Sequence, residues 1–445
     1  MNEIEQLLEY TWSLAGKIER PAERSVSYIE IAEVYLESGN KDRCWEVLAE
    51  ALKTVDALKH PDEKAGQLAW IARLLVKGGD AARARELFTR AILLSRATVT
   101  AFQKAGALYR LACEYADAEW NEEASEVLAE LYETAIDPEN HLDMACELVN
   151  IAEIYADIGM TEKAEDTLDD VIEIATALKD NWFKAERMIE AAEIYSKMEA
   201  GDKAVQILNT TGPIVECIDE TNRLGFLFKM VDIYTMTGQK SKALDTLTGA
   251  LLIIDRNTES PSRVQDLIDI SEDYWQLGDK EAAGYVLIQA KRLIEGVEEV
   301  KEKISGLISL SSVFHKMDRV DQGLDIANQA LALCGTLQDK KTVPFMMGKI
   351  AVLYAELKDR NQAAKMVSGI KQYIKETPLK TSGLGAIVNE LAESGESVLA
   401  LNLAKIISGP DIKASVLISI VQSLIEANRE PDQTRDAIQN IVEVN

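Results

Sequence analysis

The chain has 445 residues and a formal net charge of −27, and 47% of its residues are hydrophobic, which is enough for a continuous core. Only nine prolines are present, while Ala, Leu, Ile, Glu and Lys are abundant, a mixture that favours helix throughout. The longest apolar runs, such as residues 250–254, are far too short to span a bilayer, and no dense Lys/Arg cluster occurs. Composition and charge therefore argue against a membrane partner and against a nucleic-acid partner.

Residues 1–5 are acidic and lack the basic and apolar regions of a secretory signal, so we expect a cytoplasmic protein. The sequence pI of about 4.6 leaves two explanations open. Either the acidic surface attracts basic partners, or the source organism has generally acidic proteins.

The first predicted element is a helix over residues 4–19, whose apolar residues recur at helical spacing. No partner helix precedes it, so we interpret residues 1–20 as an N-terminal capping helix that covers the first full repeat of the array that follows. The apolar residues that we expect to face this repeat are Ile4, Leu7, Leu8, Leu14 and Ile18.

An internal repeat dominates the rest of the chain. One phrase, an apolar pair followed by Tyr and then Gly, recurs in eleven complete or partial copies, at spacings of 39 or 40 residues until the last two intervals of 37 and 33 residues. The copies begin at Ile31, Ile71, Leu111, Ile151, Ala191, Met230, Ile270, Leu310, Ile350, Ile387 and Ile420.

Each copy predicts two helices joined by a tight turn. Glycine, which adopts a left-handed backbone at little cost, marks the turn, and Asn40, Asp80 and Asp279 follow it as helix N-caps. A small residue then lets the second helix lie close to the first. The turn glycines are Gly39, Gly79, Gly159, Gly238, Gly278 and Gly395, and the small residues are Cys44, Ala84, Ala124, Ala164, Ala204, Ala243, Ala283, Gly323, Ala363 and Ala400.

Some copies depart from this pattern. Glu119, Asp318 and Lys358 stand where the turn glycine is expected, and in the fifth copy the glycine shifts to Gly201. The tyrosines of the repeated phrase are interpreted as packing residues.

These columns resemble the tetratricopeptide repeat family, in a long-helix variety of about 40 residues. The resemblance covers nearly the whole chain and implies an all-α fold, an α-solenoid forming a right-handed superhelix of about eleven helix-turn-helix repeats. Residues 21–378 then hold about nine regular repeats, and residues 379–445 hold two shorter, degenerate repeats and a C-terminal helix. The packing columns by themselves do not specify a function.

The resemblance also implies that the first helix of each pair lines a concave groove, at places two, six and ten residues before the turn and at others nearby. The last of these places gives Ile29, Val149 and Ile189. The candidate partner-binding residues are Tyr109, Glu153, Glu193, Phe228, Asp232, Met236, Glu272, Trp275, His315 and Phe345.

Large apolar side chains beside carboxylates suit a basic or amphipathic peptide. We therefore predict a scaffold or adaptor that binds a partner segment in its groove. Two alternatives stay open: a repeat protein that senses a ligand or peptide, and an accessory subunit that clasps a catalytic partner. The aromatic residues could instead pack in the core. The Lys/Asn clamp of repeats that hold acidic chaperone tails is absent.

The C-terminal helix, which contains Ile438, Ile441 and Val442, is expected to leave this end poorly covered. That expectation suggests a homodimer or another partner at the C-terminal end.

No sequence signature of catalysis or of a bound cofactor is found. The chain lacks a P-loop, GxGxxG, GxSxG, HExxH and EF-hand motifs. We therefore predict no catalytic residue, no cofactor and no metal site. The five dispersed cysteines are expected to be small apolar fillers, because no CxxC pair occurs. They are Cys44, Cys113, Cys146, Cys217 and Cys334.

Overall fold

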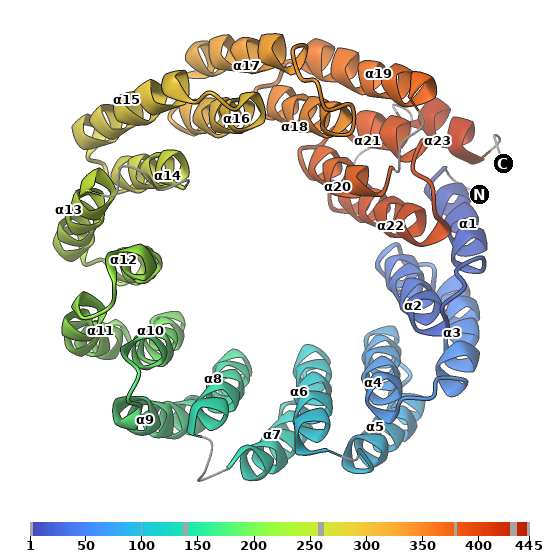
Figure 1. Ribbon diagram of the computed structural model, residues 1–445. Helices are drawn as coiled ribbons and strands as arrows, with labels where there is room; N and C mark the ends of the chain where they lie inside the picture. The colour runs from blue at the N-terminus through green and yellow to red at the C-terminus, as the bar shows by residue number, and fades with distance from the viewer. Residues whose placement is uncertain are drawn as a thin grey trace. The chain divides into compact units, whose positions relative to one another are not determined.

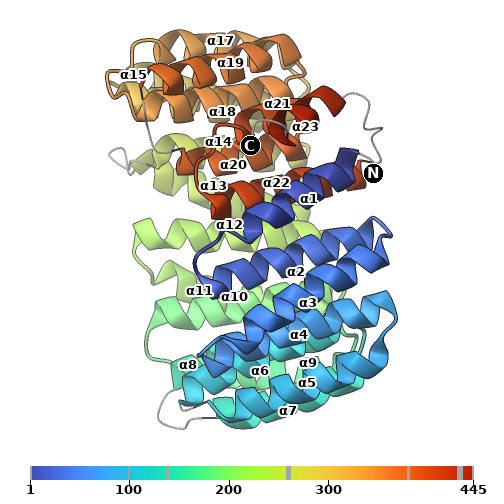
Figure 2. The same ribbon diagram turned by 90° about the vertical axis from the view of Figure 1, so that its right-hand side faces the viewer.

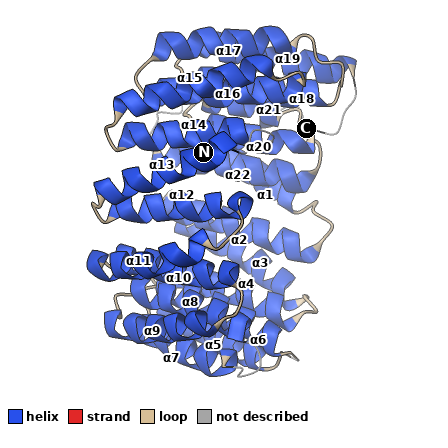
Figure 3. Ribbon diagram, turned by 60° about the vertical axis from the view of Figure 1, so that its left-hand side comes forward, coloured by secondary structure: helices blue, strands red, loops and turns tan. Residues whose placement is uncertain are grey.

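The computed structural model describes residues 3–98, 100–136, 141–256, 262–377, 381–427 and 434–442. Within these ranges the regular secondary structure is helical, as Figure 3 shows. The all-α fold predicted from the repeat is thereby confirmed. The prediction that a domain boundary falls at residue 378 lies outside the described residues.

The chain divides into two compact units. One, called unit 1, comprises Met1–Ala57, Pro261–Trp275 and Lys280–Asn445, and the other, unit 2, comprises Leu58–Ser260 and Gln276–Asp279. The helices of unit 1 are α1 (Glu3–Ala15), α2 (Pro21–Glu37), α3 (Lys41–Asp56), α14 (Arg263–Gln276), α15 (Lys280–Gly296), α16 (Val300–Lys316), α17 (Val320–Cys334), α18 (Thr342–Glu356), α19 (Arg360–Glu376), the 3-10 turn Ser382–Leu384, α20 (Gly385–Glu393), α21 (Ser397–Ala404), α22 (Pro410–Glu426) and α23 (Arg435–Val442). Those of unit 2 are α4 (Pro61–Gly78), α5 (Ala81–Arg96), α6 (Ala101–Asp117), α7 (Asn121–Ala135), α8 (His141–Asp157), α9 (Thr161–Ala177), α10 (Asn181–Lys197), α11 (Gly201–Glu216), α12 (Glu220–Met236) and α13 (Lys240–Arg256).

Consecutive helices pack as hairpins from α2 with α3 to α12 with α13, and from α16 with α17 to α20 with α21. In unit 2 the first helix of each pair lies in one layer and the second helix in the other (Figure 1). The first helices are α4, α6, α8, α10 and α12, and the second helices are α5, α7, α9, α11 and α13. The small residue that follows each turn is completely buried, for example Ala84, Ala164 and Ala243 at 0% exposure. The predicted close approach of the two helices is therefore confirmed.

The tyrosine of the repeated phrase is a core residue. Tyr35 and Tyr354 are 0% exposed and Tyr195 is 2% exposed, as a packing role requires. The hydroxyl of Tyr195 donates to Asp169, and that of Tyr354 to Asn328, in each case on a second helix 26 residues earlier.

The turns follow the predicted glycine column. Gly39, Gly79, Gly159, Gly238, Gly278 and Gly395 all have positive φ. Asn40 and Asp80 cap the next helix by accepting hydrogen bonds from the backbone N–H groups of Arg43 and Arg83.

At the four turns without glycine the backbone geometry is unchanged. Glu119, Glu199, Asp318 and Lys358 have φ values between 58° and 64°. The predicted shift to Gly201 is wrong, since Glu199 makes the fifth turn and Gly201 begins α11. Helix packing therefore fixes the turn geometry even where the residue disfavours it.

This strain gives a testable prediction. Lys358→Gly is expected to raise the free energy of unfolding by about 0.5–1 kcal/mol, because glycine relieves the left-handed strain but adds entropy to the unfolded chain. Gly159→Ala is the reverse control. No atom lies within 4 Å of the added Cβ, so only the φ of +74° opposes the change, and a loss of about 1 kcal/mol is expected. Urea denaturation measures both, and an unchanged or lower stability for Lys358→Gly contradicts the prediction.

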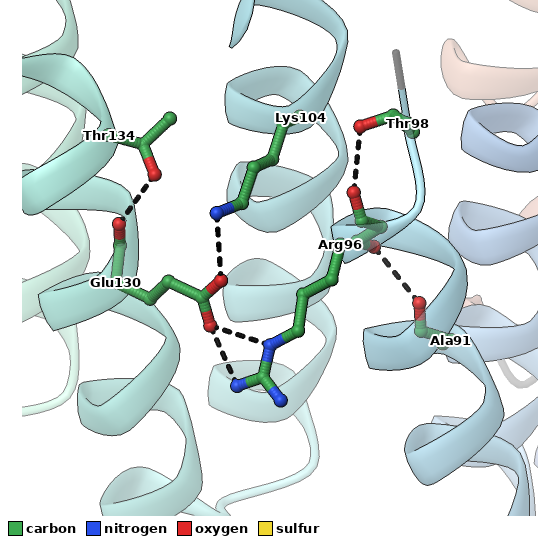
Figure 4. Close-up of polar contacts among 7 residues, drawn as sticks. Ala91, Arg96, Thr98, Lys104, Glu130 and Thr134 are labelled. Carbon is green, nitrogen blue, oxygen red and sulfur yellow. Dashed lines mark hydrogen bonds and ion pairs between the residues drawn. The ribbon is translucent and has the colours of Figure 1, made fainter. Parts of the chain in front are cut away.

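Ion pairs between repeats supplement the packing of unit 2. The Glu130 carboxylate of α7 accepts from Arg96 Nε and Nη2 of α5 at 2.9 and 2.7 Å, and lies 3.0 Å from Lys104 Nζ of α6 (Figure 4). Partial burial raises the pKa of Glu130, but the hydrogen bonds from Arg96 and Lys104 outweigh it and lower the pKa below its usual range. One carboxylate thus links three helices.

The two ends of the chain pack against each other within unit 1. Helix α1 lies against α22 and α23 as well as α2 (Figures 1 and 2). Arg435 Nε of α23 is 2.6 Å from a Glu3 carboxylate oxygen, and Ile438 and Ile441 are at most 1% exposed. The expectation of a poorly covered C-terminal end is therefore wrong, because the N-terminal helix covers it.

Helix α1 occupies the place of a second helix in the repeat pattern. The Tyr35 hydroxyl donates to Glu9 on α1, again 26 residues earlier, as in the pairs of Tyr195 and Tyr354. Helix α1 packs against α22, which has the place of a first helix in the repeat pattern and comes from the other end of the chain. Together α1 and α22 form one composite repeat.

All five cysteines are free. Cys44 and Cys334 are buried, as expected for small core residues, whereas Cys113 and Cys146 are half-buried and Cys217 is exposed. The filler role therefore describes only two of the five.

Candidate partner-binding groove

The candidate groove residues lie on first helices, six in unit 2 and four in unit 1. In unit 2, Tyr109 lies on α6, Glu153 on α8, Glu193 on α10, and Phe228, Asp232 and Met236 on α12. In unit 1, Glu272 and Trp275 lie on α14, His315 on α16 and Phe345 on α18. The two sets are described separately below.

A lysine joins two of the unit 2 carboxylates. Lys197 Nζ lies 2.9 Å from a Glu153 carboxylate oxygen and 3.2 Å from one of Glu193. Lys197 stands two residues before the turn, so the repeat register places it in line with Asp157 on the preceding first helix. The ion pairs crosslink α8 and α10.

Other carboxylates of this face remain close to like charges. Burial and the charge of Glu153 raise the pKa of Asp157, and burial and the charge of Glu193 raise the pKa of Asp232. A raised carboxylate pKa means that the anionic form is disfavoured here. A cation placed on this face would offset part of that penalty.

Apolar side chains accompany these carboxylates on α12 and α6. Met236 is 58% exposed, and Phe228 and Tyr109 are half-buried. Burial and the neighbouring Cys113 thiol raise the pKa of Tyr109 to about 12, so this phenol stays neutral. Met236 is thus the most open apolar residue of the predicted set, whereas Phe228 shares its surface with neighbouring helices.

Arg73, a basic residue on the first helix of the second copy, is neutralised by two carboxylates. Arg73, on α4, is 8% exposed, and its Nε lies 2.7 Å from Glu114 and 3.9 Å from Asp117. Its charge faces these carboxylates, so it offers little to an anionic partner.

In unit 1 the first helices α14, α16, α18 and α20 enclose a groove of about 320 Å³. Its apolar lining comes from Ile268, Ile308, Val313, Val352 and Leu353. The charged residues of the lining are Asp269, Glu272, Lys316, Lys349, Glu356 and Glu390.

Carboxylates outnumber lysines in this groove. Lys316 Nζ is 2.5 Å from Glu272, so one pair is neutralised, and Lys349 Nζ lies 5.1 Å from the centre of the Phe345 ring. Burial raises the pKa of Asp269 and of Glu390. The groove of unit 1 therefore has the same chemistry as the first-helix face of unit 2.

Of the four unit 1 candidates, only Glu272 lines this groove. Trp275 is half-buried, with Lys280 Nζ 4.7 Å from its ring centre. His315 is half-buried and its Nδ1 is buried without a hydrogen-bond partner, whereas Phe345 lies beside the groove under Lys349.

The place ten residues before the turn was wrongly expected to line a surface in the first copies. Ile29 and Ile189 are 0% exposed and Val149 is 8% exposed, so in these copies the place belongs to the core. Conversely, Lys316 and Glu356 stand two residues before their turns and belong to the groove, so a strict reading of the register would have found them. Asp269 and Glu390 do not stand two, six or ten residues before their turns, so the register gave no indication of them.

Neither a membrane helix nor a metal cluster is found in the part of the chain that the structure describes. No helix there is long and apolar enough to cross a bilayer, and no group of three or more His, Cys, Asp or Glu residues there is placed to hold a metal ion.

No family model matches the sequence, and no curated protein sequence does. Several solved structures are similar to the chain. Ton1535 from Thermococcus onnurineus NA1 is 16% identical, over 88% of this chain and 98% of that one, with a TM-score of 0.32.

Two further structures are similar at comparable levels. A putative kinesin light chain of Podosopora anserina with nearly identical TPR-like repeats is 20% identical, over 44% of this chain and 97% of that one, with a TM-score of 0.29. The STAND protein PH0952 from Pyrococcus horikoshii, which has a tetratricopeptide repeat sensor, is 17% identical, over 97% of this chain and 74% of that one, with a TM-score of 0.33. By its helix hairpins, its left-handed turns and its buried small residues, the chain resembles tetratricopeptide-type repeat proteins.

Proposed function

We propose that this protein is a non-catalytic scaffold that binds a basic or amphipathic segment of a partner protein on the first-helix face of its repeats. The observation that carries the proposal is the row of carboxylates on that face, three of which lie close enough to other carboxylates, and are buried enough, for their pKa values to be raised. Asp157 and Asp232 show it in unit 2, and Asp269 in unit 1.

Charge and shape together support a cationic partner. Lysine or arginine side chains of a partner would relieve the repulsion among these carboxylates, and exposed Met236 would contact an apolar side chain beside them. The groove of about 320 Å³ in unit 1 accommodates a few side chains rather than a folded domain. A helical or extended segment fits this surface best.

Dimerisation through the C-terminal end is not part of the proposed function. Helix α1 already covers α22 and α23, so the apolar surface that such a dimer needs is buried inside the protein.

A peptide titration tests the proposal. Fluorescence anisotropy compares a labelled amphipathic Lys/Leu helix with a Glu/Leu helix of the same pattern. The Lys/Leu peptide should bind, and its affinity should fall as the pH is lowered, because the face carboxylates, whose pKa values are raised, become protonated. Equal binding of the Glu/Leu peptide contradicts the proposal.

Matched variants separate the face from the general negative charge. The triple variant Asp157→Asn, Glu193→Gln and Asp232→Asn should weaken binding about tenfold, since three surface ion pairs contribute up to about 0.5 kcal/mol each. Exposed carboxylates on second helices of the same unit provide the control. They are changed in the triple variant Glu122→Gln, Glu173→Gln and Asp245→Asn, which alters the net charge equally. Equal losses for both variants mean that the attraction is non-specific, which rejects the face as the site.

A further inference from the structure

A cavity of about 750 Å³ lies where the two ends of the chain meet in unit 1. Its walls come from the end of α1, the segment leading into α2, and the start of α22 with the segment before it. The cavity therefore belongs to the composite repeat and is separate from the groove on α14 to α20.

One side of this cavity is apolar. Tyr10, Leu14, Ile18 and Ile407 line it, and each is at most 9% exposed. These side chains are held by the packing of α1 against α22, so the apolar wall exists only while the two ends are together.

The other side carries two lysines that form no ion pair with any residue that the structure describes. Lys17 and Lys413 line the cavity, and Lys413 Nζ is 5.8 Å from the centre of the Tyr10 ring. Burial and the charges of Lys405 and Lys17 lower the pKa of Lys413, and burial and Lys405 also lower that of Lys371. Among the described residues no ion pair involves Lys17, Lys405 or Lys413, in contrast to Lys197 and Lys316 of the first-helix face.

Three carboxylates, Glu19, Glu23 and Asp411, also line the cavity. Glu23 is held by Arg20, whose Nη1 is 2.7 Å from it, so this pair is neutral at the solvent edge. Glu19, Asp411 and Lys17 are exposed, whereas Lys413 is half-buried. Lys413 is thus the least exposed of the charged residues that line the cavity.

We propose that this cavity binds a small organic oxyanion, a carboxylate or phosphate on an apolar body, with Lys413 and Lys17 holding the anionic group and the wall of Tyr10, Leu14 and Ile407 holding the apolar body. An anion reduces the repulsion between the lysines, and the apolar body lies against a wall of side chains that the packing of the two ends holds in place. Because both ends supply the site, the bound ligand also stabilises the composite repeat.

Calorimetry on the full chain tests the site with defined probes. Phenyl phosphate and phenylacetate are titrated beside neutral phenylacetamide and inorganic phosphate. At least one aryl anion should bind about tenfold or more tightly than both controls, since charged hydrogen bonds and apolar contact each contribute. The preferred aryl anion identifies the oxyanion. No heat from either aryl anion at millimolar concentration, or equal affinity for phenylacetamide, overturns the proposal.

Two variants locate the binding. Lys413→Met should weaken binding of the preferred probe about tenfold, and Lys413→Arg should retain it. Lys291→Met, an exposed lysine of α15 in the same unit, makes the same change of net charge and should leave binding unaltered. Equal losses for Lys413→Met and Lys291→Met overturn the proposal.

Amide exchange supplies a readout that does not depend on a variant's stability. The bound probe should slow exchange in both α1 and α22 of the unaltered protein. Slowing confined to other helices places the ligand elsewhere and overturns the proposal.

Discussion

Replacing Leu7 with alanine is expected to lower the free energy of unfolding by about 2–5 kcal/mol, the range for a large aliphatic residue removed from a packed core. Leu7 lies on α1 and is 0% exposed. Helix α1 packs against both α2 and α22, so amide exchange should accelerate in α2 and in α22. This is expected even though α22 begins at Pro410, far from Leu7 in the sequence. Hydrogen exchange by mass spectrometry measures the two effects together.

Leu93→Ala is the matched control for this variant. Leu93 is 59% exposed on α5, so the same truncation should change stability by less than about 0.5 kcal/mol. If Leu7→Ala accelerates exchange in α2 and leaves α22 at its original rate, the pairing of α1 with α22 is refuted. A repeat array can melt locally, so the exchange pattern is more informative than a single melting temperature.

Glu30→Gln is expected to stabilise the protein at alkaline pH by about 2–3 kcal/mol. Burial and the charge of Glu33 raise the pKa of Glu30 from 4.5 to about 7. Such a rise corresponds to about 3 kcal/mol between the ionised and neutral forms. The unfolded chain does not bear this penalty, so removing the charge favours the folded state.

The sign of the pH dependence follows from the raised pKa. Between pH 4.5 and about 7 the folded protein binds more protons at Glu30 than the unfolded chain does, so stability decreases as pH rises through this window. The gain from Glu30→Gln should therefore be full above pH 7 and vanish below pH 4.5.

Urea denaturation at pH 8 and at pH 4.5 measures the difference. Glu173→Gln, at an exposed place on α9, makes the same change in net charge and should have little effect at either pH. A gain from Glu30→Gln that is equal at both pH values, or equal to that of Glu173→Gln at pH 8, refutes the burial of the Glu30 charge.

The local features of the repeats could be predicted from the sequence. The turn at Gly39, the cap at Asn40 and the buried place of Cys44 each depend on residues within one hairpin, and each is found as predicted. The left-handed turns at Glu119, Asp318 and Lys358, where the sequence departs from the glycine column, were not predicted and are seen only in the structure. The fifth copy misled because a glycine stands two residues after the turn at Glu199, and glycine alone does not distinguish a turn from the start of a helix.

The candidate groove could be predicted only in part. The repeat register placed Glu153, Glu193 and Asp232 on first helices, and in the structure they lie on α8, α10 and α12. Register could not tell how far neighbouring hairpins cover Ile29 or Ile189, because exposure depends on the angle and distance between hairpins. Nor could it give the ion pair of Lys197 with Glu153, since side chains 44 residues apart meet only after the hairpins have stacked.

By itself the sequence determined an all-helical chain of about eleven hairpins, with turns and packing columns at a nearly constant period, because these features arise from contacts within a hairpin or between adjacent hairpins. Only the tertiary structure decided that α1 pairs with α22 and that a cavity with Lys17 and Lys413 lies between the ends. The Glu3–Arg435 pair joins residues 432 positions apart, and no periodicity specifies a contact at that separation. Burial of apolar side chains between α1 and α22 provides the physical reason for it.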